Sequence, residues 1–190
     1  MITKLKTYGL HKKYFVEDVV GRFKKAKEEG FSVLKFKGID FDATKEIVCK
    51  RNGNLQGIKS CDIFVADEFY NLFDFIEIKE LQNVISCNPL KKLKEFEIES
   101  KFKDSLRILK LIVNERDFSE TDFDKLIDSY PKKLILGIFV EEIKGKKGEN
   151  LFYQKLFIFQ RELLRKVPEA SVLVKPILKI NEYYKNIGYF

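Results

Sequence analysis

The chain has 190 residues, which is enough to bury one hydrophobic core, and we expect a single domain over residues 1–190. Hydrophobic residues make up 45% and charged residues 34%, an ordinary composition for a soluble globular protein. The formal net charge of +7 favours a polyanionic partner such as nucleic acid, although a lysine-rich surface also serves simply to keep a protein solvated.

The cysteine and histidine content excludes several kinds of site. The three cysteines, Cys49, Cys61 and Cys87, form no CxxC pair, so the sequence predicts neither a disulfide framework nor a zinc cluster, and we expect a cytoplasmic location. His11 is the only histidine, which excludes paired-histidine mechanisms. No signal-peptide core and no stretch of ~20 apolar residues is present, so no membrane partner is expected.

The amino-terminal half predicts one helix followed by strands. Apolar residues recur at helical spacing from Val16 to Phe23, and Gly30 stops that pattern. The expected elements are a helix at Lys13–Glu29 and strands at Phe31–Lys37, Glu46–Arg51, Asp62–Asp67 and Phe73–Lys79. Only the short segment EFYNL separates the last two strands, a spacing typical of a β-hairpin.

The carboxyl-terminal half alternates helices and strands. Its most apolar stretch, Lys133–Glu142, predicts a strand buried at the centre of a sheet. The other expected elements are a helix or strand at Lys92–Ser100, helices at Lys101–Glu115, Thr121–Ser129 and Asn150–Lys166, and a strand at Ser171–Ile180 that Pro176 confines to a sheet edge. This order predicts an α/β fold in which a mixed β-sheet is flanked by helices.

The expected strand Phe73–Lys79 carries charged residues among its apolar ones. Because side chains alternate between the faces of a strand, Glu77 and Lys79 point to the same face. A buried carboxylate and ammonium cost free energy unless they are paired or given a metal. Asp62 opens the neighbouring strand of the hairpin, and strand pairing can bring its carboxylate close to that of Glu77.

Two carboxylates joined by a backbone carbonyl form a set of hard oxygen ligands. Asp62, Glu77 and the carbonyl of Ile78 suit Mg²⁺, with Mn²⁺ as a second choice. Such a metal can polarise a phosphoryl oxygen and lower the pKa of water. Lys79 can position the attacking water or neutralise charge on the phosphate. The pattern therefore favours phosphodiester hydrolysis.

The run from Cys61-Asp62 to Glu77-Ile78-Lys79 resembles the signature of the PD-(D/E)xK nuclease superfamily, with Cys61 at the position of the proline. The resemblance implies a restriction-endonuclease-like fold, a mixed sheet flanked by helices. It implies that Asp62 and Glu77 ligate the metal and that Lys79 acts in catalysis. We therefore expect a magnesium-dependent DNA endonuclease.

The stretch from about residue 10 to residue 80 is also similar to the opening of archaeal-type Holliday-junction resolvases. In those enzymes a helix glutamate completes the metal site, and Glu17 matches it by its place before Gly30-Phe31. A branched-DNA resolvase and a restriction or defence nuclease are thus both expected subclasses. A homodimer is expected for either, because cutting two strands needs two sites. The fold often places basic side chains such as Lys101 and Lys103 near the scissile phosphate.

Several alternatives stay open on the sequence alone. Glu77 and Lys79 could form only an ion pair, in a nucleic-acid-binding or assembly protein that keeps the fold without catalysis. The substrate could be RNA rather than DNA. Whether His11 or Asp67 joins the metal site is also open. Asp74 flanks the hairpin turn as Asp67 does, and carboxylates in such places are usually solvated.

Residues 1–80 carry the active-site motifs, and we expect residues 81–190 to complete the core and to supply recognition or dimerisation. The basic loop Lys144–Gly148 can contact phosphates, although a solvated loop is the simpler expectation. The tail aromatic residues more often pack on a core or a dimer partner than stack on bases. They are Tyr183, Tyr184, Tyr189 and Phe190.

Overall fold

The computed structural model describes residues 38–52, 55, 57–67, 69–81, 83, 86–114, 131–140, 143 and 145–189. The strands are β1 (Ile39–Asp40), β2 (Ile63–Asp67), β3 (Leu72–Leu81), β4 (Lys133–Val140) and β5 (Ser171–Pro176), and the helices are α4 (Phe41–Arg51), α5 (Pro89–Phe96), α6 (Ile98–Asn114), α8 (Gly145–Lys166) and α9 (Ile177–Asn186). The expected elements Lys13–Glu29, Phe31–Lys37 and Thr121–Ser129 lie outside the described residues, as do Glu17 and His11.

The strands form one mixed sheet in the order β1-β2-β3-β4-β5. β1, β2 and β3 pair antiparallel, whereas β3, β4 and β5 pair parallel. The expected hairpin is confirmed, with Ile63 of β2 opposite Ile76 of β3. The α/β class with a mixed sheet and flanking helices is therefore confirmed for the part of the chain that the structure describes.

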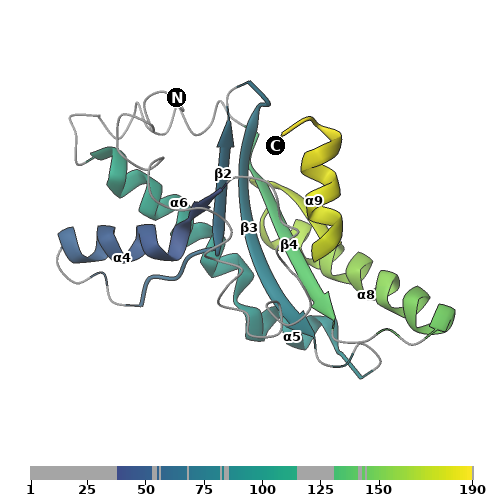
Figure 1. The fold of residues 1–190 in the computed structure, drawn as a ribbon. Coiled ribbons are helices and arrows are strands. Elements are labelled where there is room, and N and C mark those ends of the chain that lie inside the picture. Colours follow the sequence, from purple (N-terminus) through teal and green to yellow (C-terminus); the bar gives the residue numbers. More distant parts are fainter. Residues whose placement is uncertain are drawn as a thin grey trace.

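Helices cover both faces of this sheet (Figure 1). Phe73 and Phe75 of β3 pack in one core with residues of α4, α5, α6 and α8. Ile76 and Ile78 pack on the opposite face with residues of α9. The alternation expected for this strand is thus confirmed, and β3 is an interior strand buried on both faces.

Helix α4 occupies the segment that was expected to be a strand at Glu46–Arg51. It begins after Asp40, whose side chain caps the helix by accepting the N–H of Ala43 at 3.0 Å. Phe41 and Val48 lie two helical turns apart and are both buried. The strand prediction was wrong because a short apolar run does not by itself distinguish the two structures, and the cap and the helical spacing decide.

The region Lys92–Ser100, predicted as either helix or strand, is helical. The side chain of Asn88 accepts the N–H groups of Leu90 and Lys91 at 3.1 and 3.2 Å, and proline occupies the first turn of α5. Glu97 then takes a left-handed conformation with φ of 55°, which ends α5 and lets α6 start in a new direction.

The carboxyl-terminal segment is a strand followed by a helix. β5 ends at Pro176 and lies at the edge of the sheet, as the proline predicts. Ile177–Ile180 was expected to continue the strand, but it forms the start of α9. The reason is the helical spacing of Ile177, Ile180 and Tyr184, which are all buried against the sheet. No helix of the described residues is long and apolar enough to cross a membrane.

Asp74 is buried rather than solvated, so the expectation for this hairpin carboxylate was wrong. Only 1% of its surface is exposed, and its Oδ2 accepts a hydrogen bond from the hydroxyl of Tyr184 at 3.0 Å. Burial raises the pKa of Asp74, while Lys133 and this hydrogen bond oppose the rise. Tyr184 itself is fully buried, which confirms the core role predicted for the tail aromatic residues at this position.

The substitution Tyr184→Phe should lower the free energy of unfolding by about 1–3 kcal/mol, because it leaves a buried carboxyl oxygen without this donor. Urea denaturation followed by circular dichroism measures the change. Tyr153→Phe removes a hydroxyl from a half-exposed tyrosine and is the matched control, with an expected change within about 0.5 kcal/mol. Equal effects of the two substitutions would contradict a structural role for the Tyr184 hydroxyl.

Candidate active site

The hairpin brings the two predicted carboxylates together. Since Ile63 pairs with Ile76, Asp62 lies across from Glu77 and on the same face of the sheet. Asp62 is only 9% exposed, and its Oδ2 accepts the backbone N–H of Ile78 at 2.7 Å. The carbonyl of a residue projects to the same side of an extended strand as its N–H. The carbonyl of Ile78 therefore points toward the side on which Asp62 lies.

Glu77 is completely buried, and its two carboxylate oxygens have different surroundings. Its Oε1 lies 2.5 Å from the Nζ of Lys79 and 2.5 Å from the Nζ of Lys101. Its Oε2 has no hydrogen-bond partner in the described part of the chain. An unsatisfied buried carboxylate oxygen is costly, so this atom marks a place where a further ligand would be stabilised.

The second cation, Lys101, comes from the first turns of α6. The sequence resemblance expected it only near a substrate phosphate, and its contact with Glu77 was not foreseen. The sequence did carry a signal for this contact. Phe102, Leu106 and Leu109 repeat at helical spacing and mark the side of the helix that packs on the sheet, and Lys101 lies next to that side. Lys79 also lies over the ring of Phe96, with its Nζ 5.8 Å from the ring centroid.

The charges of the site perturb one another. Burial first and the neighbouring Asp62 second raise the pKa of Glu77 from 4.5 to about 7, against the pull of the two ammonium groups. Burial also raises the pKa of Asp62, while its hydrogen bond from Ile78 lowers it. Burial lowers the pKa of Lys101, but the charge of Glu77, its hydrogen bond and the charge of Asp62 together outweigh burial, and the net shift is upward. Glu77 is therefore about half protonated near pH 7.

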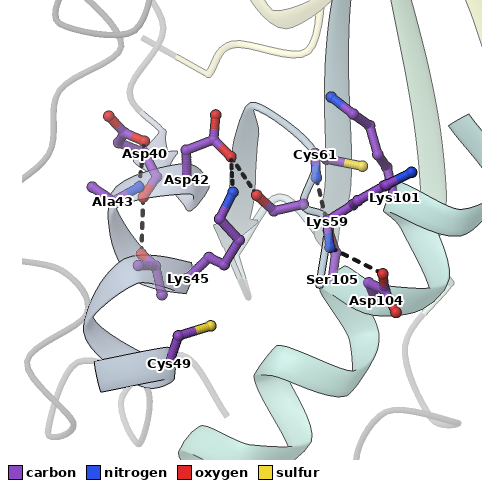
Figure 2. Close-up of polar contacts among 12 residues, drawn as sticks. Asp40, Asp42, Ala43, Lys45, Cys49, Lys59, Cys61, Lys101, Asp104 and Ser105 are labelled. Atoms are coloured by element: carbon purple, nitrogen blue, oxygen red, sulfur yellow. Dashed lines mark hydrogen bonds and ion pairs between the residues drawn. The ribbon is translucent and has the colours of Figure 1, made fainter. Parts of the chain in front are cut away.

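The segment that leads into Asp62 is fixed by two helices (Figure 2). From α6, Ser105 accepts the N–H of Cys61 at 2.9 Å and Asp104 accepts the N–H of Lys59 at 3.0 Å. From α4, the carboxylate of Asp42 accepts the hydroxyl of Ser60 at 2.5 Å and pairs with Lys45 at 3.0 Å. These contacts set the position of Asp62, and sequence reasoning found none of them.

Other candidate residues do not reach the site. Asp67 lies at the far end of β2, about 17 Å along the strand from Asp62. Its Oδ1 accepts the N–H groups of Phe69 and Tyr70 at 3.0 and 3.2 Å, so it stabilises the hairpin turn and lies away from Asp62 and Glu77. Gly145–Gly148 of the expected basic loop forms the first turn of α8.

The carboxylates of Asp62 and Glu77 and the carbonyl of Ile78 are oxygen ligands of the kind that a hard divalent cation prefers, and they would supply part of its coordination shell. Within the described ranges, no group of three or more histidine, cysteine or acidic side chains converges on one point. Asp62 and Glu77 lie opposite each other across the hairpin, and the unpaired Oε2 of Glu77 is the atom that most requires a cation. Glu17, the third carboxylate implied by the resemblance, lies outside the described residues.

The ion pair of Glu77 and Lys79, on which the alternative interpretation depends, is also present. It accounts for Oε1 of the glutamate but not for the unpaired Oε2 or for the burial of a second carboxylate, that of Asp62, directly opposite.

Comparison of the chain with protein-family models, with curated proteins and with solved structures gave no match. Its chemistry must therefore be argued from the residues themselves.

Glu77→Gln should flatten the pH dependence of stability. A carboxyl whose pKa is raised on folding stabilises the folded state fully below pH 4.5, and this contribution is lost as the pH rises through about 7. The loss from this one group is on the order of 3 kcal/mol between pH 4 and 8. Urea denaturation of the metal-free protein across this range measures the slope.

Glu80→Gln is the control for that measurement, because Glu80 is exposed on the opposite face of β3. It should keep the slope of the unmodified chain. The same slope in the Glu77→Gln variant would show that Glu77 does not hold a proton in the folded protein near neutral pH.

Proposed function

We propose that this chain is a magnesium-dependent endonuclease that hydrolyses DNA phosphodiester bonds, with a restriction-endonuclease-like fold of the PD-(D/E)xK type. The observation that carries the proposal is the unpaired, fully buried Oε2 of Glu77 opposite the buried Asp62. The mixed sheet with helices on both faces is the architecture that the sequence resemblance implies.

Asp62, Glu77 and the carbonyl of Ile78 would hold Mg²⁺ or Mn²⁺, with Glu17 as an accessory ligand. When bound, such a cation supplies positive charge to the phosphate and lowers the pKa of water. Asp62 is prepared for this role by its hydrogen bond from Ile78, which fixes its Oδ2. The buried setting strengthens every charge interaction at the site, because little water is present to screen it.

Lys79 and Lys101 are the groups that would meet the substrate phosphate. Their side chains are 23% and 19% exposed, so each reaches solvent while its ammonium group contacts Glu77. Either ammonium can turn from the glutamate to stabilise negative charge on the phosphate, and Lys79 can also orient the attacking water. Because two ammonium groups contact one carboxylate oxygen, one of them can move to the phosphate while the other stays paired with Glu77.

A second candidate function is supported by the same cluster. Above pH 7, where Glu77 is ionised, the charges of Glu77 and Asp62 balance those of Lys79 and Lys101, so the site is then neutral without any metal. Such a cluster would suit a nucleic-acid-binding or assembly protein that does not cleave. Hydrolysis of RNA instead of DNA is a third possibility with the same residues, and the substrate comparison below separates the three.

The purified protein should cleave DNA in Mg²⁺ or Mn²⁺ and not in EDTA. Labelled linear, branched and single-stranded DNA, and RNA of the same sequence, should be compared side by side. Asp62→Asn and Lys79→Ala should each lower the rate by about 100-fold or more, since each removes one charged group from the reacting centre. Asp67→Asn, at the far end of β2, is the control and should keep the rate.

An undiminished rate in Asp62→Asn would point to a contaminating enzyme. Binding of nucleic acid without cleavage of any substrate would favour the non-catalytic function, and cleavage confined to RNA would assign the chain to the RNA nucleases.

Lys101→Ala should reduce the cleavage rate by about 10- to 100-fold, because it removes one of the two ammonium groups on Glu77. Lys103→Ala is the matched control on the same helix. Lys103 is more than half exposed and pairs with Glu99 at 2.8 Å, away from Glu77. Single-turnover kinetics measure both variants. Equal rates for the two would remove Lys101 from the proposed site.

A further inference from the structure

A third lysine, Lys59, lies at the edge of the candidate active site. It precedes Asp62 by three residues, in the segment that α6 holds in place. Asp104 of that helix accepts the backbone N–H of Lys59 at 3.0 Å. The side chain of Lys59 then reaches Glu97, and its ammonium group forms an ion pair with that carboxylate. The position of Lys59 is therefore set by the same helix that carries Lys101.

The partner of Lys59 stands close to the other two lysines of the site. Glu97 lies between α5 and α6, and its carbonyl accepts the N–H of Lys101 at 3.0 Å in the first turn of α6. The residue before it is Phe96, whose ring centroid lies 5.8 Å from the Nζ of Lys79. The hydrogen bond and the charge of Lys59, with smaller effects of Lys101 and Lys79, lower the pKa of Glu97. Three lysines, from the segment before β2, from β3 and from α6, thus surround this junction of two helices.

Glu97 holds its place in a backbone conformation that glutamate rarely adopts. Its φ of 55° is left-handed, and the residue that ends a helix in this way is usually glycine or asparagine. The end of α5 therefore does not require a glutamate side chain. A residue held in such a conformation at some cost in stability points to a role of its side chain, and in the described structure the carboxylate of Glu97 pairs with Lys59.

The ion pair of Lys59 and Glu97 is open to solvent. The two side chains are 38% and 49% exposed, whereas Glu77 is fully buried. Exposed ion pairs stabilise a protein only slightly, because water screens both charges. A phosphate group can therefore replace the carboxylate of Glu97 on the ammonium group of Lys59 at small cost.

We infer that Lys59 binds a second phosphate of the substrate, next to the phosphate at the reacting centre, and that Glu97 occupies the place of this second phosphate in the free protein. Binding of the substrate then exchanges one anionic partner of Lys59 for another. The inference rests on the proposed function, because it takes a nucleic-acid strand as the substrate. It makes Lys59 a substrate-binding residue and Glu97 a competitor that is built into the chain.

Binding of labelled DNA, and of RNA of the same sequence, tests this inference in EDTA, where no cleavage is expected. Lys59→Ala should weaken binding by roughly 3- to 10-fold at low salt, as expected for one charge-assisted phosphate contact. On duplex DNA it should also reduce the slope of log affinity against log salt concentration by about 0.9, because one phosphate contact is lost. Lys59→Arg keeps the charge and should keep both values.

The ion pair of Lys179 and Glu182 on α9 is the matched control. Its side chains are 50% and 55% exposed, and α9 packs on the opposite face of the sheet. Lys179→Ala changes the net charge by the same amount as Lys59→Ala, so it reports only the effect of overall charge. It should weaken binding by less than about 2-fold and leave the salt slope unchanged.

Removal of the competing carboxylate should have the opposite effect. Glu97→Gln should tighten binding by about 2- to 5-fold, and Glu97→Gly, which suits the left-handed backbone, should do the same. In the Glu97→Gln chain, Lys59→Ala should cost more affinity than in the unmodified chain, because Lys59 then has no carboxylate to leave. Glu182→Gln is the control and should change the affinity by less than about 2-fold.

Three results would overturn the inference: equal effects of Lys59→Ala and Lys179→Ala, weaker binding in Glu97→Gln, or no binding of either nucleic acid at low salt. Cleavage that depends on Asp62, together with equal effects of the two lysine variants, would leave the proposed function standing without this phosphate contact. The expected loss of affinity in Lys59→Ala, in a protein that cleaves no substrate, would support the contact and contradict the nuclease proposal.

Discussion

The structure depends on one buried carboxylate. Glu77 stands in the interior strand of the sheet with none of its surface exposed, where an isolated charge would be strongly destabilising. Two ammonium groups offset this cost at Oε1, whereas Oε2 has no hydrogen-bond partner among the residues that the structure describes. Helix α6 places Lys101 beside Glu77, and the register of β2 places Asp62 opposite it.

The fold explains why such a site can exist. β3 pairs antiparallel with β2 and parallel with β4, so it is covered at both edges and on both faces. The register of the hairpin then fixes which carboxylate lies opposite Glu77, and a shift by one residue would turn Asp62 to the other face. Contacts from Ser105, Asp104 and Asp42 hold the segment before Asp62 and so stabilise that register.

The sequence predicted the hairpin, the interior strand β3 and the pairing of Asp62 with Glu77, because these depend on local alternation and a short connection. It did not predict Lys101 as a partner of Glu77, since that contact depends on how α6 packs on the sheet, which no local pattern encodes. The strand expected at Glu46–Arg51 was wrong for a local reason, because a cap at Asp40 outweighs a short apolar run. Asp74 was expected in solvent, but α9 buries it through Tyr184.

The central claim is that Oε2 of Glu77 and the carboxylate of Asp62 share a divalent cation. A crystal structure of the protein soaked in Mn²⁺, with an anomalous difference map, tests it most directly. The account predicts one strong peak between these two side chains and the carbonyl of Ile78, at roughly 2.0–2.3 Å from each oxygen. A map without such a peak, in which Glu77 remains paired with Lys79 and Lys101 alone, would contradict it.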